Sequence, residues 1–87
     1  MYHTLVLQAA LDFIDENIKN EITLAMIAEK AGYSPYHFSR VFTGTIGISL
    51  MSYVTWRRLQ YALFDLSRGK KVIDVAMEYG FECVKQG

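Results

Sequence analysis

Residues 22–47, ITLAMIAEKAGYSPYHFSRVFTGTIG, decide the fold because they contain two short helical patterns joined across a glycine. In the first pattern, apolar side chains recur at the spacing that forms a stripe along one face of a helix. These side chains are Leu24, Ile27, Ala28 and Ala31. Thr23 is a suitable N-cap for this helix, and Gly32 can adopt the positive φ that ends it. The stretch therefore predicts a helix, a tight turn and a second helix.

The second helix is predicted over residues 35–45. Ser34 can cap its free N–H groups, and Pro35 suits the first helical position because proline has no N–H to leave unpaired. Its apolar face consists of Phe38, Val41 and Phe42. The outward face carries hydrogen-bonding side chains at helical spacing, namely Tyr36, Ser39, Arg40 and Thr43. Two faces of this kind indicate a helix that packs on one side and is presented to a partner on the other.

The composition fits one small domain. The chain has 87 residues, 52% of them hydrophobic, and a single cysteine, Cys83. One cysteine excludes an internal disulfide, and no group of residues has the spacing of a metal site or a cofactor motif. No basic segment followed by a long apolar run indicates a signal peptide or a membrane span. We therefore expect a cytoplasmic protein that needs neither a metal nor a cofactor.

The formal net charge is zero, which taken alone argues against a nucleic-acid partner, because phosphate binding depends on lysine and arginine. The charges are unevenly distributed along the chain, however. Residues 34–71 carry six basic side chains and one acidic, net +5, whereas residues 1–33 are net −3 and residues 72–87 net −2. Positive charge is therefore concentrated in the segment that contains the outward face.

Three further helices are predicted around the central unit. The first covers residues 4–18 and is amphipathic with an acidic outer face. The longest covers residues 49–67, begins at the capping residue Ser49 and would measure about 27 Å, enough to separate two small lobes. Its apolar stripe is predicted to consist of Leu50, Tyr53, Val54, Leu59, Ala62, Leu63 and Leu66. A shorter helix follows over residues 72–79 and ends at Gly80.

A weak internal repeat connects the two ends of the chain. Residues 27–33, IAEKAGY, and residues 75–81, VAMEYGF, share a branched aliphatic residue, an alanine, a glycine and an aromatic residue at an offset of 48. The alanine permits close helix crossing, and the glycine makes the turn. The chain is therefore predicted to begin a second helix-turn-helix, with too few residues after Gly80 to complete it.

The outward face of the 35–45 helix favours sequence-specific binding to double-stranded DNA. Such a helix fits the major groove, where arginine can bind the guanine edge and hydroxyl groups can bind bases or phosphates. Base contacts are predicted from Tyr36, Ser39, Arg40 and Thr43. Phosphate contacts are predicted from Ser34, His37, Ser49, Arg57 and Arg58, the two arginines being alternatively framework charges.

Other interpretations of these residues stay open. A polar helix face is often merely solvated, and Trp56, Tyr53 and Phe64 are expected to pack in the core or between subdomains. The competing function is a self-associating or protein-interaction module, because an incomplete second unit would leave apolar side chains uncovered. These are Val72, Val75, Ala76, Tyr79 and Phe81. An enzyme is not expected, because no nucleophile–base pair, paired carboxylates or phosphate-cradling loop is present.

A series of short motifs runs through nearly the whole chain, from Leu5 to Phe81. It comprises Ile27-Ala28, Gly32-Tyr33-Ser34, Phe38-Ser39-Arg40, Phe42, Gly47, Ser49, Tyr53, Arg58-Leu59, Ala62, Val75-Ala76 and Tyr79-Gly80-Phe81. This series resembles the DNA-binding domain of AraC/XylS-type transcription regulators. So many matches in order are much more specific than a generic helix-turn-helix.

The resemblance implies an all-α fold with three parts. A homeodomain-like helix-turn-helix subdomain would cover residues 1–47, a linker helix residues 49–67, and the first part of a second helix-turn-helix residues 72–87. It implies a bacterial transcription regulator on the nucleoid that places residues 35–45 in the major groove. It also implies RNA polymerase as a further partner.

The family's second recognition helix and its closing motif would lie beyond Gly87. We therefore interpret the chain as a truncated regulator or a natural remnant of one. On this interpretation we expect weak, poorly selective DNA binding and self-association through the 72–81 helix.

Overall fold

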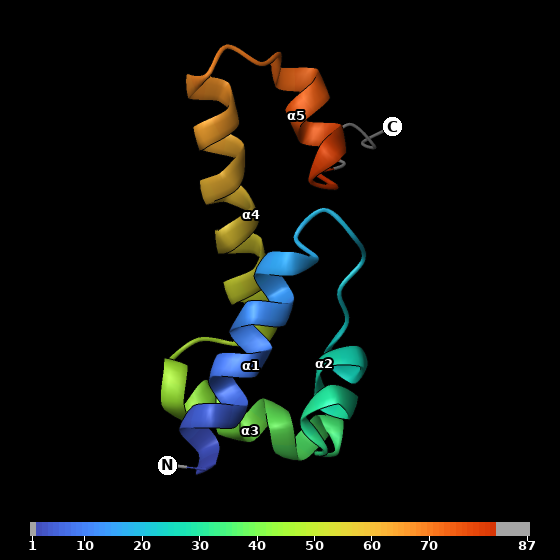
Figure 1. Cartoon of the computed structure of the whole chain (residues 1–87), viewed down its shortest axis with the longest axis vertical. Coiled ribbons are helices and arrows are strands. Elements are labelled where there is room, and N and C mark those ends of the chain that lie inside the picture. The colour runs from blue at the N-terminus through green and yellow to red at the C-terminus, as the bar shows by residue number, and fades with distance from the viewer. Residues whose placement is uncertain (1, 82–87) are drawn as a thin grey trace.

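The computed structural model describes residues 2–81, except for the side chains of residues 2 and 3, and every regular element in this range is a helix (Figure 1). The helices are α1 (Tyr2–Glu16), α2 (Leu24–Ala31), α3 (Pro35–Ile46), α4 (Leu50–Ser67) and α5 (Val72–Glu78). The all-α class is confirmed, and each predicted helix is present with only its ends shifted. The predicted second unit beyond residue 81, including Cys83, lies outside the described residues.

Local sequence signals set the boundaries of α2 and α3. The Thr23 hydroxyl accepts a hydrogen bond from the backbone N of Met26 at 3.1 Å, and the Ser34 hydroxyl accepts one from His37 N at 3.1 Å. Gly32 lies in the left-handed region with φ 80. A side chain at that φ would be strained, so glycine allows the chain to leave α2 and start α3 within three residues.

The molecule is elongated, with extents of 41 × 29 × 20 Å. Helices α1, α2 and α3 form a three-helix unit at one end, α4 rises away from it, and α5 runs back beside α4 (Figure 1). Helix α4 therefore leads from the three-helix unit to the far end of the molecule, where its C-terminus lies. Helix α3 closes the end of the three-helix unit, where its outward face is open to solvent.

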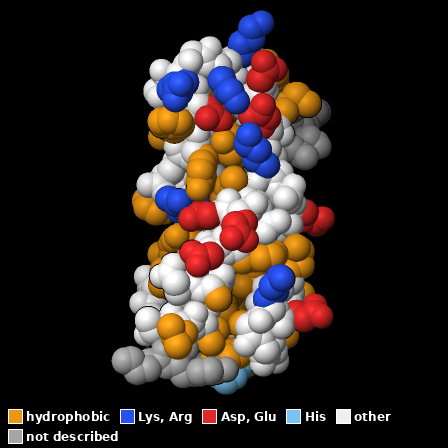
Figure 2. All heavy atoms as spheres, viewed as in Figure 1, with side chains coloured by type: hydrophobic (Ala, Val, Ile, Leu, Met, Phe, Trp, Pro, Cys, Tyr) orange, Lys and Arg blue, Asp and Glu red, His pale blue; other side chains and the backbone are white. Residues whose placement is uncertain are grey.

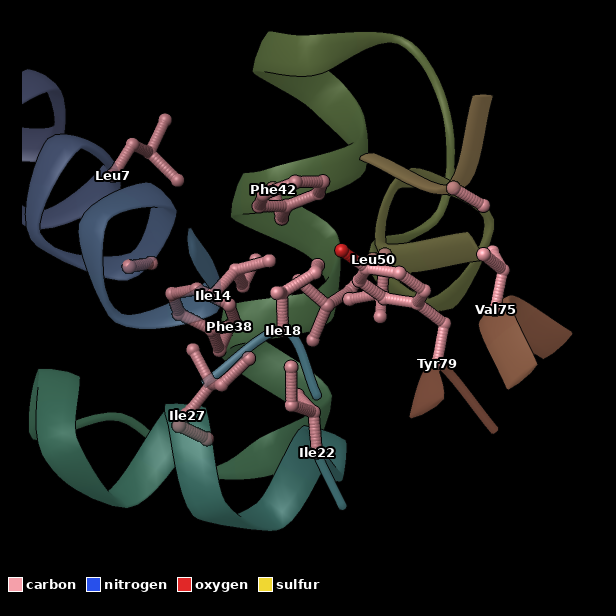
Figure 3. Packing of buried hydrophobic residues seen from close by; sticks show 14 residues of the cluster. Leu7, Ile14, Ile18, Ile22, Ile27, Phe38, Phe42, Leu50, Val75 and Tyr79 are labelled. Atoms are coloured by element: carbon pink, nitrogen blue, oxygen red, sulfur yellow. The ribbon is translucent and has the colours of Figure 1, made fainter. Parts of the chain in front are cut away.

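The buried side chains form one cluster that extends from α1 to α5 (Figure 3). Phe38 and Phe42 are fully buried. Phe38 lies between α1 and α2, beside Ile14 and Ile27, and the Phe42 ring lies 5.9 Å from that of Tyr53 in α4. Burying each such phenylalanine contributes about 1.5–3 kcal/mol. This packing fixes α3 by its apolar face and leaves its polar face outward. The division into two subdomains stays a prediction.

The predicted apolar stripe of α4 is only partly buried, and this prediction is corrected. Leu50, Val54 and Ala62 are buried, but Leu59 and Leu63 are half-exposed. Helix α4 has apolar residues on most of its sides, so periodicity alone does not specify which side faces the core. The three-helix unit and α5 cover one side only.

Two aromatic residues of α4 are also not where the sequence analysis expected them. Trp56 is 52% exposed and Phe64 is 58% exposed, so neither is a core residue. Tyr53 does pack against the buried cluster, and its ring lies 5.9 Å from that of Phe42 and 6.3 Å from that of Trp56. Trp56 therefore covers the edge of the core from outside.

The internal repeat is confirmed as a repeat of geometry. Tyr33 N donates to Ala28 O at 3.0 Å after α2, and Phe81 N donates to Ala76 O at 2.8 Å after α5. Gly80, like the glycine that ends α2, has φ 80. Both helices thus end in a Schellman-type turn with the same long hydrogen bond.

The apolar face of α5 differs from the one expected. Val75 and Tyr79 are buried, and Ala76 and Phe81 are partly buried, so these four are not an uncovered surface. The side chains left exposed are Val72, Ile73 and Met77. Helix α5 therefore packs Val75 and Tyr79 into the buried cluster beside α4, and of the predicted patch only Val72 stays exposed.

Candidate nucleic-acid interface

The outward face of α3 gathers the four residues for which base contacts were predicted. Tyr36, Arg40 and Thr43 are exposed, and Ser39 between them is partly buried. They lie on the side of α3 opposite Phe38 and Phe42, because residues three or four apart share a helix face. The structure thus brings together the predicted set on one continuous strip of surface.

Within this strip, Arg40 contacts both the hydroxyl group and the aromatic ring of Tyr36. Arg40 Nη1 donates to the Tyr36 hydroxyl oxygen at 2.8 Å, and the guanidinium carbon lies 5.6 Å from the centre of the Tyr36 ring. Arg40 is the only lysine or arginine in α3. The positive charge of this face is therefore held at one point, against an aromatic ring.

His37 lies beside this pair at the N-terminus of α3. Its ring stacks on that of Tyr33, with 4.8 Å between ring centres. A shallow hollow of the surface is lined by Tyr36, His37, Arg40 and Val41. The Tyr33 ring in turn lies 6.0 Å from that of Phe38, so the outer aromatic groups rest on the buried ones.

The two serines predicted to contact phosphate are helix caps. The Ser34 hydroxyl is bound to His37 N, as described above, and the Ser49 hydroxyl accepts from Ser52 N at 3.2 Å. Ser49 also donates to the Ser52 hydroxyl at 3.0 Å. Both serines are exposed, at the first turns of α3 and α4, where free backbone N–H groups favour anions.

Arg57, by contrast, belongs to the contact between α4 and α1. Its Nε and one terminal nitrogen lie 3.1 Å from Asp15 Oδ1, and Nη1 donates to Gln60 at 2.7 Å. The hydrogen bond to Asp15 raises the pKa of Arg57 above its ordinary value. The guanidinium is therefore already paired, which is the framework alternative for this residue.

Arg58 joins α4 to the segment after α1. Its Nε donates to the carbonyl oxygen of Ile18 at 3.0 Å, and Nη2 donates to that of Asn20 at 2.6 Å. Backbone carbonyls at the end of a helix and just after it have no hydrogen-bond partner within the helix. Arg58 donates a hydrogen bond to each of these two carbonyl oxygens. Sequence spacing gave no signal for this contact, because about 40 residues separate the donor from its acceptors.

The uneven distribution of charge along the chain is partly neutralised in space. Lys70 lies 3.9 Å from Asp65 and 3.6 Å from Glu78, and Lys19 lies 3.5 Å from Glu78. Figure 2 shows acidic side chains gathered over the C-terminal half of α1, on the face turned to the viewer. That face is unsuited to a phosphate backbone. Helix α3 is the better candidate for contact with a nucleic acid.

Other kinds of site find little support in residues 2–81. No group of three or more His, Cys, Asp or Glu side chains in this range is arranged to hold a metal ion. Within the same residues, no helix is both long and apolar enough to cross a membrane.

Comparison with known proteins adds a family to this geometry. A family model described as a helix-turn-helix domain matches residues 27–86. The Transposon Tn10 TetD protein of Escherichia coli is 35% identical over 82 residues, which cover 93% of this chain and 59% of that protein. The regulatory protein SoxS of Salmonella typhimurium is 30% identical over 82 residues, covering 93% of this chain and 77% of SoxS. The HTH-type transcriptional activator AarP of Providencia stuartii is 32% identical over the same length, covering 61% of AarP.

Proposed function

Since the chain belongs to the AraC/XylS-type helix-turn-helix family of transcription regulators, we propose that it binds double-stranded DNA with α3 in the major groove. The observation that carries this proposal is the exposed strip of α3, which presents one arginine and three hydroxyl side chains away from the core. A helix docked in the major groove places such a strip against the base edges.

Within this proposal the polar residues divide into three roles. Arg40, Ser39 and Thr43 face the bases, where arginine recognises guanine and the hydroxyl groups accept or donate. Ser34, His37 and Ser49 lie at the first turns of α3 and α4 and contact phosphates, together with the backbone N–H groups there. Arg57 and Arg58 take the framework role, because their guanidinium groups are bound to α1 and to the segment after it.

The names of two bacterial relatives support a proposal for the cellular setting. SoxS is named a regulatory protein, and AarP is named a transcriptional activator. We place this chain with the DNA in the bacterial cytoplasm, with RNA polymerase as a further partner. Self-association is the alternative function, and the exposed side chains that favour it are Val72, Ile73 and Met77.

The test is DNA selection followed by substitution of Arg40. Double-stranded oligonucleotides are selected from a random pool by the wild-type chain, and affinities for the selected sequence are measured in a gel-shift assay. Arg40→Ala is expected to weaken binding about 5- to 150-fold, which corresponds to the 1–3 kcal/mol of a good arginine–guanine contact. The Arg40→Ala variant is also expected to lose its preference for one base over the others at a single base pair of the selected sequence.

Lys30→Ala is the matched control, because it removes one exposed positive charge from α2 rather than from α3. It is expected to change the affinity much less than the α3 substitution. If no sequence is enriched, the proposed sequence-specific binding is refuted. If the two variants lose the same affinity, α3 is not the DNA-binding element.

A further inference from the structure

We propose that Tyr36 is a positioning residue, which holds the Arg40 guanidinium so that the two side chains act as one unit specific for guanine. This inference rests on the proposed function and changes one role within it. Tyr36 would act through Arg40 rather than as a base contact of its own. The juxtaposition that carries it is the double contact between the two side chains.

The contact is specific in its geometry. The 2.8 Å hydrogen bond from Arg40 Nη1 to the Tyr36 hydroxyl and the 5.6 Å approach of the guanidinium to the ring act on the same cation. Tyr36 and Arg40 are four residues apart, the spacing at which side chains meet along a helix. Within residues 2–81, no carboxylate is paired with Arg40.

Tyr36 contributes little to the packing of the fold. Its side chain is 71% exposed, so it adds almost nothing to the core. An exposed arginine samples many rotamers, and DNA binding has to restrict them. A tyrosine that already restricts the guanidinium reduces that loss of conformational freedom, because the donor is in place before DNA arrives.

The hydrogen-bond polarity of the pair points to one base. Arginine offers only N–H donors, and the Tyr36 oxygen uses an acceptor site for Arg40 while its O–H stays a donor. The pair therefore presents donors to the groove. Guanine displays two acceptors there, N7 and O6. Adenine pairs an acceptor with a donor, thymine displays a single acceptor beside its methyl group, and cytosine displays a donor. Guanine is the base that matches.

The experiment combines Tyr36→Phe with Arg40→Ala on DNA selected by the wild-type chain. Tyr36→Phe keeps the ring and removes only the hydroxyl. The expected result is a three- to tenfold loss of discrimination between guanine and adenine at one base pair, on the order of one hydrogen bond. In the Arg40→Ala background the same substitution is expected to have no effect, because Tyr36 acts through Arg40.

Two further measurements separate positioning from a structural effect. The thermal midpoint and the salt dependence of binding are expected to match the wild type, since neither the core nor a phosphate contact changes. Tyr61→Phe removes the same atom from α4 and is the matched control.

The inference is overturned if Tyr36→Phe leaves discrimination unchanged, or if it weakens binding equally with and without Arg40. The latter result would make Tyr36 an independent DNA contact. Failure of the proposed function has a different signature, because the wild-type chain would then enrich no sequence at all.

Discussion

At the scale of single residues, Tyr79 connects α5 to α4. Its hydroxyl donates to Asp65 Oδ2 at 2.8 Å, and its ring is buried beside that of Tyr61. Burial first, and then the hydrogen bond to Asp65, disfavour the phenolate, and together they raise the pKa of Tyr79 from 10.0 to about 12. Lys19 also lies over this ring, 5.3 Å from its centre.

This raised pKa predicts a loss of stability in alkali. Because the pKa in the folded state is the higher one, the stabilisation is complete below pH 10.0 and is lost as the pH rises through about 12. Tyr79→Phe is expected to lower the free energy of unfolding by about 1.5–3 kcal/mol at neutral pH, the value of a hydrogen bond to a charged group. Urea unfolding of the wild type and of Tyr79→Phe, from neutral pH to about pH 12, measures the free energy of unfolding of each protein. The difference between the two proteins should shrink with rising pH, and a constant difference would contradict the assignment.

Residue-scale features were predictable where the physics is local. Thr23, Ser34 and Gly32 act within three or four residues of their own positions, so both caps and the turn were predicted correctly. Arg57 and Arg58 act across about 40 residues, and their partners depend on how α4 crosses α1. No spacing rule in the chain encodes that crossing.

At the scale of elements, α4 is held to the three-helix unit by polar contacts as well as by apolar ones. Only Leu50, Val54 and Ala62 of its 18 residues are buried. Arg58 adds two hydrogen bonds to the carbonyls after α1. The apolar stripe was mispredicted because half-exposed leucines and aromatic residues also occur on sides of α4 that the described helices leave exposed.

Arg58→Met should therefore act on stability rather than on DNA binding. Loss of both hydrogen bonds to the carbonyl oxygens is expected to lower the free energy of unfolding by about 1–3 kcal/mol. Arg58→Lys is expected to cause part of this loss, because an ammonium group lacks the forked donors of the guanidinium. The affinity of the folded variants for selected DNA and its salt slope should be unchanged. A slope reduced by about 1 would instead identify Arg58 as a phosphate contact.

At the scale of the whole molecule, one buried cluster joins α5 to the three-helix unit. Val75 and Tyr79 belong to the same cluster as Phe38 and Phe42, although 33 or more residues separate them in sequence. The fold class and helix order were predictable from periodicity and from the repeat. The continuity of the core was not, because it depends on α5 folding back beside α4.

A single core predicts cooperative unfolding of the described chain. Val75→Ala is expected to lower the free energy of unfolding by about 2 kcal/mol, from the loss of two buried methyl groups. The shift should be equal whether urea unfolding is followed by Trp56 fluorescence or by helical circular dichroism.

Val72→Ala, the same substitution at a 71% exposed position of α5, should change the unfolding free energy by no more than about 0.5 kcal/mol. A Val75→Ala variant that loses part of its helical signal while the Trp56 transition stays in place would show that α5 unfolds on its own.

The series of ring contacts from His37 through Tyr33, Phe38, Phe42 and Tyr53 to Trp56 has an optical consequence. Trp56 is the only tryptophan of the chain, and it lies half in solvent at the far end of this series. Light absorbed by the tyrosines passes to it by energy transfer over these short distances. Its emission is therefore a built-in, label-free signal of how α3 is seated against α4, and it can be recorded while DNA is titrated in.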